Sequence, residues 1–578
     1  MLKLFRFLRP YRGLALLVLV FAFAQSLGNL LLPRLLSDIV DKGIARGDLR
    51  EILTVGGVML VVSIVTTACA IASSYCSGKV STGFGKLVRS AVFSRASNLS
   101  LHQFERFGSA SLVTRTTNDT TQVQQMLIMM LMMVIPAPLM AVGGVILALS
   151  QDAQLAWVLL GVMPIMAVVF FIIMRKAVPL STAMQVKIDR LNLVLGEGLS
   201  GIRVIRAFDR GPHQRERFDE ANLDVTETAI AVNRLISILM PALILMLNLT
   251  GLAIIWVGSH RIDQGDMQVG AMIASLQYAF QILFAVFMVT AMFVMLPRAE
   301  ASAARINEVL DLEPEISDPA APAAAAPPAP PRGRVQFENV TFQYHGAEEP
   351  ALSGISFTAN PGEVTAIIGG TGSGKSTLAG LIPRFYDVNE GRVLLDGVDI
   401  REMTQDALRS RIGFVPQKAV LFTGTVAANI RYGREDATDD EVRHAATVAQ
   451  AIDFVDAMPE GFASAVSQGG INLSGGQKQR LAIARAVVRR PDVYVFDDSF
   501  SALDFATDAR LRAALKQETG GATVFIVAQR VSTVINADRI IVLDNGRVAG
   551  MGTHAELLEK SEVYREILSS QVSLDEVA

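Results

Sequence analysis

The chain has 578 residues, a net charge of −3, 51% hydrophobic residues and a mean hydropathy of +0.39. With only 19% charged residues it is too apolar for an ordinary soluble enzyme, and its charge balance gives no sign of a nucleic-acid partner. Its two cysteines, Cys69 and Cys76, lie in one apolar stretch. On a helix they would be about 10 Å apart along the axis, which excludes a disulfide between them. No redox or metal role is indicated.

Composition divides the chain into two unlike parts. The first 300 or so residues alternate long uncharged runs with basic loops, whereas the sequence from residue 334 onward mixes polar residues with short strand-like runs. Between them lies a run of prolines and alanines at 319–331, which cannot build a core and is typical of a semi-rigid linker. We therefore expect a transmembrane domain over 1–313, a linker over 314–333 and a second domain over 334–578.

The first part contains uncharged windows long enough to cross a membrane. A membrane helix needs about 20 apolar residues. Windows of this length lie at 13–33, 52–78, 120–151, 153–174, 235–260 and 267–297. The sequence thus predicts an all-α transmembrane domain of six helices.

The charges of the connecting loops predict the orientation of these helices. The connections 79–119 and 175–234 are rich in lysine and arginine, whereas 150–154 has no basic residue and 259–266 has only Arg261. By the positive-inside rule, both long connections and both termini lie in the cytoplasm. Residues 1–25 could instead be a signal peptide, but the apolar run continues past Ala22–Ala24. We interpret residues 1–12 as a basic amphipathic segment on the inner membrane surface.

A phosphate-binding loop of the G-x-x-x-x-G-K-[ST] type occupies 369–376. Its glycines let successive backbone N–H groups surround phosphate oxygens, Lys375 adds a positive charge, and Ser376 offers a hydroxyl to Mg²⁺. The apolar run Val364–Ile368 predicts a buried strand before the loop. A helix starting near Lys375 would direct its positive N-terminus at the phosphates.

Four further motifs follow this loop in order: Phe414–Gln417, Leu473–Gln477, Tyr494–Asp497 and Ser501–Asp504. With the phosphate loop, they resemble the nucleotide-binding domain of ATP-binding-cassette (ABC) transporters. The resemblance implies an α/β P-loop NTPase domain of the ABC ATPase type that binds ATP and Mg²⁺. It implies a nucleotide site built from Tyr344, Gly369, Gly370, Thr371, Gly372, Ser373, Gly374, Lys375, Ser376, Thr377, Gln417, Asp497, Ser474, Gly475, Gly476, Gln477 and Asp504.

Within that set the resemblance assigns individual roles. Tyr344 would stack on adenine. Ser376, Gln417 and Asp497 would hold Mg²⁺, partly through water. The Ser474–Gln477 signature would contact the γ-phosphate of a nucleotide held by a different subunit.

The first part of the chain is similar to the transmembrane half of type IV ABC exporters. The match rests on the stretches Gly108–Asp119 and Glu197–Phe208. The family places short coupling helices in the two long cytoplasmic connections, which we expect near 104–112 and 209–213. The resemblance implies a multi-pass protein of the bacterial inner (cytoplasmic) membrane with a cytoplasmic nucleotide domain.

Two positions depart from the family pattern. Asp498 stands where hydrolysing members have the glutamate that polarises the attacking water, and Gln529 stands where they have the switch histidine. Asp498 is one methylene shorter, and a misplacement of about 1 Å can cost on the order of 10²-fold in rate. Gln529 cannot carry a proton or a positive charge. In addition, Gln468 replaces a glutamate common in the family.

The signature Ser474–Gln477 is intact, although the catalytic positions are altered. A heterodimer explains both facts, because each ATP site in the family combines one subunit's Walker motifs with the other's signature. The chain would then carry a slow site of its own and complete a competent site on a second half-transporter with an intact glutamate and switch histidine. This pattern resembles the degenerate subunit of heterodimeric bacterial multidrug exporters. A weakly active homodimer is the alternative.

Methionines in the third and sixth spans suggest a hydrophobic or lipid cargo. They lie at 126–133 and at Met288, Met292 and Met295, and could equally pack or face lipid. The spans contain few interior charges, which favours drugs or lipids over charged cargo. An importer with the same fold, or a regulatory subunit that binds ATP, remain alternatives to an exporter.

Overall fold

The computed structural model describes residues 1–319 and 332–571, and omits the side chains of 289–294. Most of the predicted linker 314–333 lies outside the described residues. The chain forms two compact units. The first contains residues 1–97 and 108–312, and the second contains 98–107 together with the chain from residue 313 onward.

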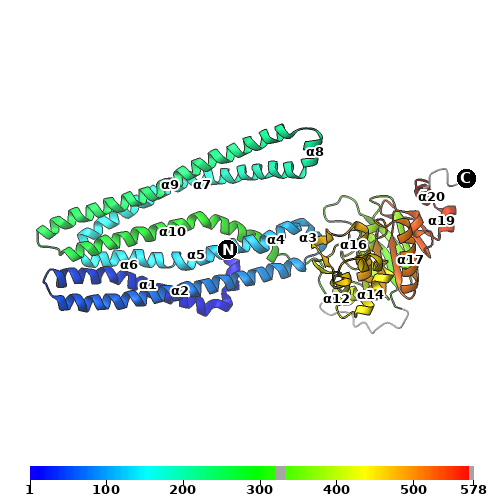
Figure 1. Ribbon diagram of the computed structural model, residues 1–578, viewed down its shortest axis with the longest axis horizontal. Helices are drawn as coiled ribbons and strands as arrows, with labels where there is room; N and C mark the ends of the chain where they lie inside the picture. Colours follow the sequence, from blue (N-terminus) through cyan, green and yellow to red (C-terminus); the bar gives the residue numbers. More distant parts are fainter. Residues whose placement is uncertain (320–331, 572–578) are drawn as a thin grey trace. The chain divides into compact units, whose positions relative to one another are not determined.

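The first unit is entirely helical (Figure 1). Within the described residues it supplies six helical stretches that are long and apolar enough to cross a membrane, as the sequence predicts. Its elements are η1 (Leu2–Tyr11), α1 (Arg12–Asp38), η2 (Ile39–Ile44), α2 (Leu49–Ser97), α4 (Ser109–Thr114), η3 (Arg115–Asp119), α5 (Thr120–Met129), η4 (Met130–Val134), α6 (Pro136–Gln151), α7 (Ala153–Ser200), α8 (Ile202–Ala207), α9 (Gly211–Asp263) and α10 (Val269–Leu310).

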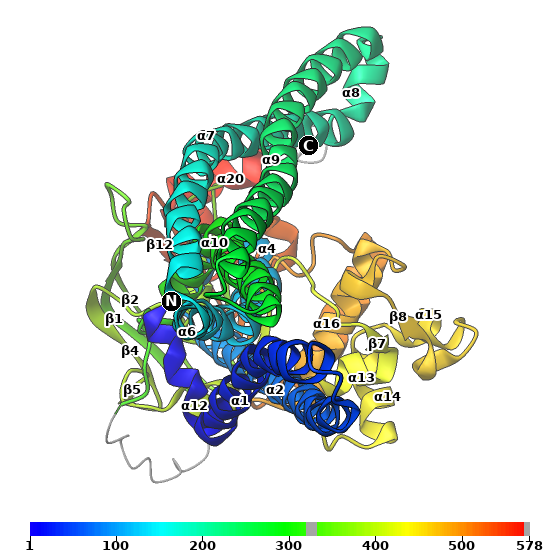
Figure 2. The same ribbon diagram turned by 90° about the vertical axis from the view of Figure 1, so that its left-hand side faces the viewer.

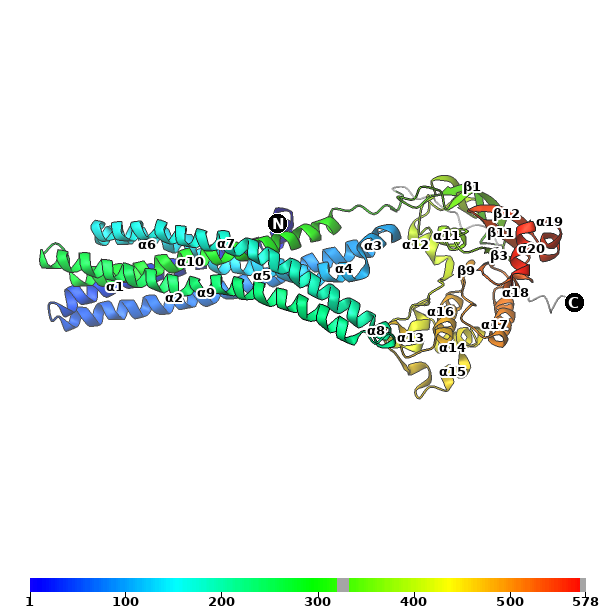
Figure 3. The same ribbon diagram turned by 90° about the horizontal axis from the view of Figure 1, so that it is seen from above.

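The helices of this unit form two groups. Seen end on, α1 and α2 lie together, whereas α7 and α9 diverge from them toward α8 (Figure 2). The pair α7 and α9 runs side by side along its length and is joined by α8 (Figure 3). Large apolar side chains on this pair and its connection are exposed, including Leu199 of α7 and Phe208 after α8 at 68% and 74%. Such a surface on a single chain is typical of an interface with a partner.

The third span is interrupted in its middle. The π-helix η4 ends at Val134, and α6 begins with Pro136. Proline has no N–H to donate and is best placed in the first turn of a helix. The wider turn before it takes up the break in the hydrogen-bond ladder, so the helical path continues through Ile135.

A buried ion-pair network joins the third span to the last helix. Asp119 is 2% exposed and accepts from Ser302 Oγ over 2.9 Å and from Arg305 Nε over 2.8 Å. Beside it, Arg115 Nη1 donates to Glu308 Oε2 over 2.8 Å. A buried carboxylate is stable only when its charge is paired, so these contacts fix η3 against α10.

The short helix in the connection between the second and third spans belongs to the second unit. It is α3 (Leu101–Phe107), and it is followed by Gly108, where φ is +73°. Gln103 Nε2 donates to Glu313 O over 2.8 Å, and Ser100 Oγ donates to Glu315 Oε2 over 2.7 Å. The helix therefore lies earlier than the expected 104–112, because its position is set by contacts more than 200 residues away in sequence.

The second short helix also lies earlier than expected. α8 covers Ile202–Ala207, and the expected segment 209–213 instead contains the turn that follows it and the start of α9. Asp209 has a φ of +51°, a conformation that ends a helix. The polar, glycine-containing stretch around Arg210 thus marks the turn, not the helix.

The second unit is built on sheets. A six-stranded sheet has the order β12-β11-β3-β10-β9-β6, parallel except for β12, and a four-stranded antiparallel sheet has the order β2-β1-β4-β5. The strands are β1 (Val335–Phe342), β2 (Leu352–Ala359), β3 (Val364–Gly369), β4 (Glu390–Leu395), β5 (Val398–Asp399), β6 (Ile412–Val415), β7 (Gly424–Thr425), β8 (Ala465–Val466), β9 (Val493–Asp497), β10 (Thr523–Val527), β11 (Arg539–Asp544) and β12 (Arg547–Gly552).

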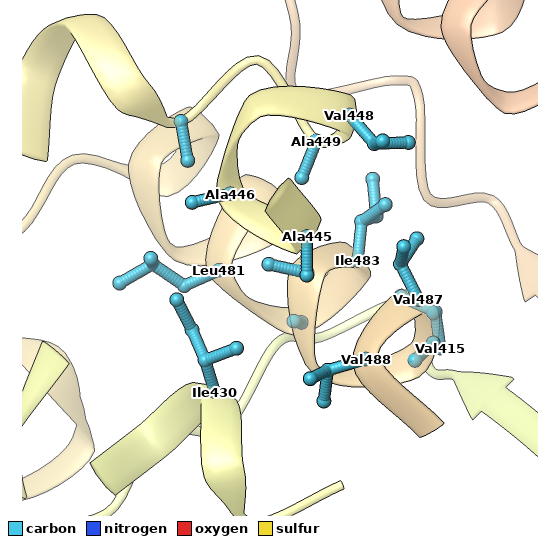
Figure 4. Packing of buried hydrophobic residues seen from close by; sticks show 14 of the residues in the cluster. Val415, Ile430, Ala445, Ala446, Val448, Ala449, Leu481, Ile483, Val487 and Val488 are labelled. Carbon is cyan, nitrogen blue, oxygen red and sulfur yellow. The ribbon is translucent and has the colours of Figure 1, made fainter. Parts of the chain in front are cut away.

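Helices cover this framework and form a subdomain of their own. They are α11 (Lys375–Leu381), α12 (Gln405–Ser410), α13 (Val426–Arg431), α14 (Asp439–Val448), α15 (Ile452–Asp456), η5 (Gly461–Ala463), η6 (Gln468–Gly470), α16 (Gly475–Arg489), α17 (Phe505–Glu518), α18 (Val531–Val534), α19 (His554–Lys560) and α20 (Glu562–Ser569). Apolar residues of α13, α14 and α16, such as Ile430, Ala445 and Ile483, pack into one core (Figure 4). The core also contains Val415 of β6 and Phe496 of β9, so it packs the body of α16, whose N-terminus carries the signature, against the central sheet.

Candidate nucleotide site

The candidate site lies at the carboxyl ends of parallel strands. β10, β9 and β6 are neighbours in the sheet, and β3 lies on the other side of β10. The phosphate loop follows β3, Asp497 ends β9, and Gln529 and Gln417 lie two positions beyond β10 and β6. In parallel sheets these ends meet at one edge, which is where open α/β sheets bind ligands.

The phosphate loop has the conformation that its sequence predicts. Gly372 and Gly374 have φ values of +83° and +96°, and α11 starts at Lys375. A Cβ at Gly374 would come within 2.7 Å of Ala351 O, so the turn accepts only glycine there. Lys375 Nζ donates to the carbonyl oxygens of Gly369 and Gly370 over 2.9 and 2.6 Å. Burial lowers the pKa of Lys375, and the nearby Asp498 and Asp497 oppose that shift.

Ser376 and Asp497 form an oxygen-rich corner suited to a hard cation. Ser376 Oγ donates to Asp497 Oδ1 over 2.9 Å, and Asp497 is 7% exposed. Burial raises the pKa of Asp497, and the charge of Asp498 raises it further, whereas Ser376 and Lys375 oppose the shift. A hydroxyl and a carboxylate next to a phosphate loop fit Mg²⁺, which takes one or two protein oxygens and completes its octahedron with phosphate and water.

Asp498 is held by two glutamines at once. Gln417 Nε2 and Gln529 Nε2 each donate to Oδ2 of Asp498 over 3.1 Å. The backbone of Asp498 has a φ of +46°, and its N–H donates to Val527 O over 3.0 Å. The two residues expected at the catalytic positions, Asp498 and Gln529, thus meet together with Gln417, which was expected to hold Mg²⁺. The carboxylate faces two neutral amides, which carry no charge and transfer no proton.

Tyr344 lies beside the first turn of α11. Its hydroxyl is 2.9 Å from Oγ1 of Thr377, and its ring packs edge-on against Phe342 and Tyr386. The side chain is 38% exposed, so a ring surface remains accessible. This geometry suits stacking on a nucleobase whose phosphates lie in the neighbouring loop.

The signature residues form the N-terminus of α16. Ser474 caps this helix: its Oγ accepts from Gln477 N over 3.3 Å, and its own N–H donates to Gln477 Oε1 over 2.9 Å. Gly475 and Gly476 occupy the first turn, whose N–H groups point along the helix axis. Asp504 caps α17: its Oδ1 accepts from Thr507 N over 2.9 Å. The hydrogen bonds from Thr507 lower the pKa of Asp504. Both motifs therefore present helix N-termini, which favour anions.

A separate apolar cavity lies in the first unit between α7, α9 and α10. Its volume is about 410 Å³. Every lining side chain that the structure describes is apolar, among them Met166, Phe170, Met174, Met246 and Phe287. Sequence reasoning selected the methionines at 126–133 and Met288, Met292 and Met295 instead. Of these, Met126 is buried, Met132, Met133 and Met295 are exposed, and the side chain of Met292 lies outside those described. This cavity could have been predicted from the spacing of Met166, Phe170 and Met174. Four residues apart on a helix, they place three large apolar side chains on one face of α7.

Comparisons with known proteins agree with this architecture. Residues 15–286 match the model of the ABC transporter transmembrane region, and residues 352–501 match the ABC transporter model. An uncharacterized ABC transporter ATP-binding protein of Mycobacterium tuberculosis is 44% identical, covering 98% of this chain and 97% of its own length. The ATP-dependent lipid A-core flippase of Chromobacterium violaceum is 31% identical, covering 99% and 97%.

A solved structure also resembles the chain over its whole length. It is described as a bacterial Atm1-family ABC exporter with ATP bound. The TM-score is 0.80 at 28% identity, and the match covers 98% of this chain and 99% of the other. The similarity includes both units, so the order of spans and nucleotide-binding domain is shared.

Proposed function

This chain belongs to the ABC exporter family, and we propose that it works as one half of a heterodimer that exports acyl-chain lipids or similar amphiphiles across the bacterial inner membrane. One polypeptide carries one transmembrane region and one ATPase domain, so the half-transporter fold implies a dimer.

The observation that carries the heterodimer is the state of Asp498. Two side-chain amides, from Gln417 and Gln529, bond to the same carboxylate oxygen. These amides orient the carboxylate, but neither can take up a proton or carry charge, so the short side chain must activate water unaided. Among the described residues, no imidazole bonds to Asp498 to stabilise charge as it develops. Weak activation of water by this chain's own site follows from both features.

The rest of the site favours nucleotide binding. Lys375 and the amides of the phosphate loop hold phosphate oxygens, Ser376 and Asp497 hold Mg²⁺, and Tyr344 provides a surface for the base. The signature helix α16 is capped and well packed, with its first-turn N–H groups available to a phosphate on another subunit. Such a chain binds ATP, cleaves it slowly and keeps an intact signature. It would therefore complement a partner that carries the missing glutamate and histidine.

Two matched substitutions test whether this chain contributes its signature to the fast ATP site and its Walker motifs to the slow one. In the dimer of this chain with its partner, Ser474→Ala removes a phosphate contact from the partner's competent site, so ATP turnover should fall on the order of 10²-fold. Lys375→Ala damages only the slow site and should leave most of the turnover intact. In a homodimer each substitution would be present in both ATP sites. Equal losses from the two variants would therefore refute the heterodimer.

The restoration of the two altered positions tests the site itself. Asp498→Glu alone should raise single-turnover cleavage at this chain's site only modestly, because Gln529 still cannot stabilise charge. The double variant Asp498→Glu with Gln529→His should cleave much faster than either single variant. A full recovery by Asp498→Glu alone would show that Gln529 is no defect.

The cavity between α7, α9 and α10 supports a lipid-like cargo. Its described lining side chains, which include methionine and phenylalanine, are all apolar, so they offer dispersion contacts to an alkyl chain and no partner to a charged group. The lipid A-core flippase among the relatives moves a molecule of this chemistry. We place an acyl chain of the cargo in the cavity.

Transport in vesicles tests this assignment. Ala242→Phe fills the cavity and should slow ATP-dependent movement of a fluorescent acyl-chain lipid, while ATP affinity stays unchanged. Leu252→Phe, at a 62% exposed position of the same helix, is the matched control and should transport normally. If both variants transport alike, the cavity does not hold the cargo.

A further inference from the structure

The C-terminal helix α20 is anchored in the core that supports the switch segment 528–531. Tyr564 of α20 is fully buried in a cluster that includes Ala528 and Val531, on either side of Gln529 and Arg530. Its hydroxyl bonds to His554 Nδ1 of α19 over 2.7 Å. The position of α20 is therefore fixed relative to the end of β10 and the start of α18.

Gln571, which lies just after α20, contacts the switch segment directly. Gln571 Nε2 donates to the backbone carbonyl of Gln529 over 2.7 Å, and Gln571 Oε1 accepts from the backbone N–H of Val531 over 2.8 Å. The side-chain amide thus pairs with the backbone on both sides of Arg530, as a neighbouring strand would. Only a side chain with both a donor and an acceptor on one amide can make this pair of bonds.

A chain of contacts connects Gln571 to the phosphate loop through Gln529. The backbone of Gln529 is held by Gln571, and its side chain donates to Asp498 Oδ2 over 3.1 Å. Asp498 in turn follows Asp497, the residue bonded to Ser376 of the phosphate loop. The orientation of the Gln529 side chain depends on the backbone from which it extends.

We propose that Gln571 is a positioning residue for ATP cleavage: its amide fixes the switch segment so that Gln529 holds Asp498 at the site. This role concerns the geometry of the chain's own site and is independent of the partner's identity. Without Gln571, the carbonyl of Gln529 and the N–H of Val531 would bond to water, and the segment would sample other conformations. Asp498 would then lose one of its two amide contacts for part of the time.

The first test measures the segment itself. Amide hydrogen exchange at Val531 in the full-length chain should be roughly 5- to 10-fold faster in Gln571→Ala, since one hydrogen bond of ordinary strength is lost. Gln571→Glu keeps the acceptor for Val531 but places a carboxylate against the Gln529 carbonyl, so it should also accelerate exchange. Gln517→Ala, at an exposed glutamine of α17, is the control and should leave exchange unchanged.

The second test measures catalysis. Single-turnover ATP cleavage by the full-length chain in nanodiscs should slow by roughly 3- to 10-fold in Gln571→Ala, with the Kd for ATP unchanged. In a Gln529→Ala background, Gln571→Ala should have no further effect, because both act through one contact. Additive losses in the double variant, or a cleavage rate equal to that of the unsubstituted chain, would overturn the proposal. A parallel loss of ATP affinity would do so as well.

Discussion

The hydroxyl of Ser376, in the first turn of α11, bonds to the carboxylate of Asp497 over 2.9 Å, although β3, which leads into the phosphate loop, and β9, which ends at Asp497, are separated in the sheet by β10. The contact brings the end of the phosphate loop to the deepest acid of the site. It also leaves Asp497 buried next to a second carboxylate, Asp498, and both burial and this neighbour raise its pKa. The ionised form of Asp497 is thus less favourable in the folded chain than in the unfolded one.

Asp497→Asn should make the chain more stable while weakening its binding of Mg²⁺ and nucleotide. Because the pKa of Asp497 in the folded state lies above its unfolded value, the charged form destabilises the fold at neutral pH. The substitution removes that charge and keeps an acceptor for Ser376. The thermal midpoint, measured without nucleotide, should rise by roughly 2 °C. Asp504→Ala, which removes a helix cap at an acid with a lowered pKa, should have the opposite effect on stability.

Asp498→Asn should let Mg²⁺-dependent nucleotide binding persist to more acidic pH. Binding requires the charged form of Asp497, and the negative charge of Asp498 disfavours that form. Removing this charge lowers the pKa of Asp497, so the carboxylate stays ionised further into the acid range. A titration of fluorescent nucleotide binding from about pH 7 to pH 4 measures the shift. A midpoint that stays in place or moves to higher pH would contradict the coupling.

The transmembrane helices and the phosphate loop could be predicted because their signals are local. Window 13–33 falls within α1, and four of the other windows also fall within the spans, whereas window 267–297 starts two residues before α10. The apolar run Val364–Ile368 is β3, and α11 starts at Lys375 as expected. A stretch of apolar residues, or glycines around a lysine, specifies its own conformation largely without reference to the rest of the chain.

Features that depend on distant contacts could not be read from the sequence. α3 begins at Leu101 because Gln103 bonds to Glu313, a residue far along the chain. The two amides on Asp498 come together only because β6, β9 and β10 are neighbours in the sheet. No spacing in the sequence shows that strand order, and the family resemblance gave the positions of the residues but not this pair of bonds.

Arg305→Ala should strongly destabilise the transmembrane unit. Arg305 donates to both oxygens of Asp119, whose side chain is 3% exposed. Removing the arginine leaves a buried charge without its main partner, which typically costs about 3–5 kcal/mol. The thermal midpoint of the full-length chain in detergent should fall accordingly. The double variant Arg305→Ala with Asp119→Asn should recover part of the loss, because it removes the unpaired charge as well. If the double variant is less stable than Arg305→Ala, the pairing argument is wrong.

Tyr344→Ala should weaken ATP binding through the loss of a stacking surface. Base–aromatic stacking contributes about 1–3 kcal/mol, so the Kd for ATP should rise roughly tenfold. Tyr344→Phe keeps the ring and loses only the hydroxyl contact to Thr377, so it should bind ATP nearly as well. Inorganic triphosphate, which has no base, provides the matched ligand control. Its affinity should be the same in all variants, because the phosphate loop is untouched. An equal loss for ATP and triphosphate in Tyr344→Ala would show that the residue supports the loop rather than the base.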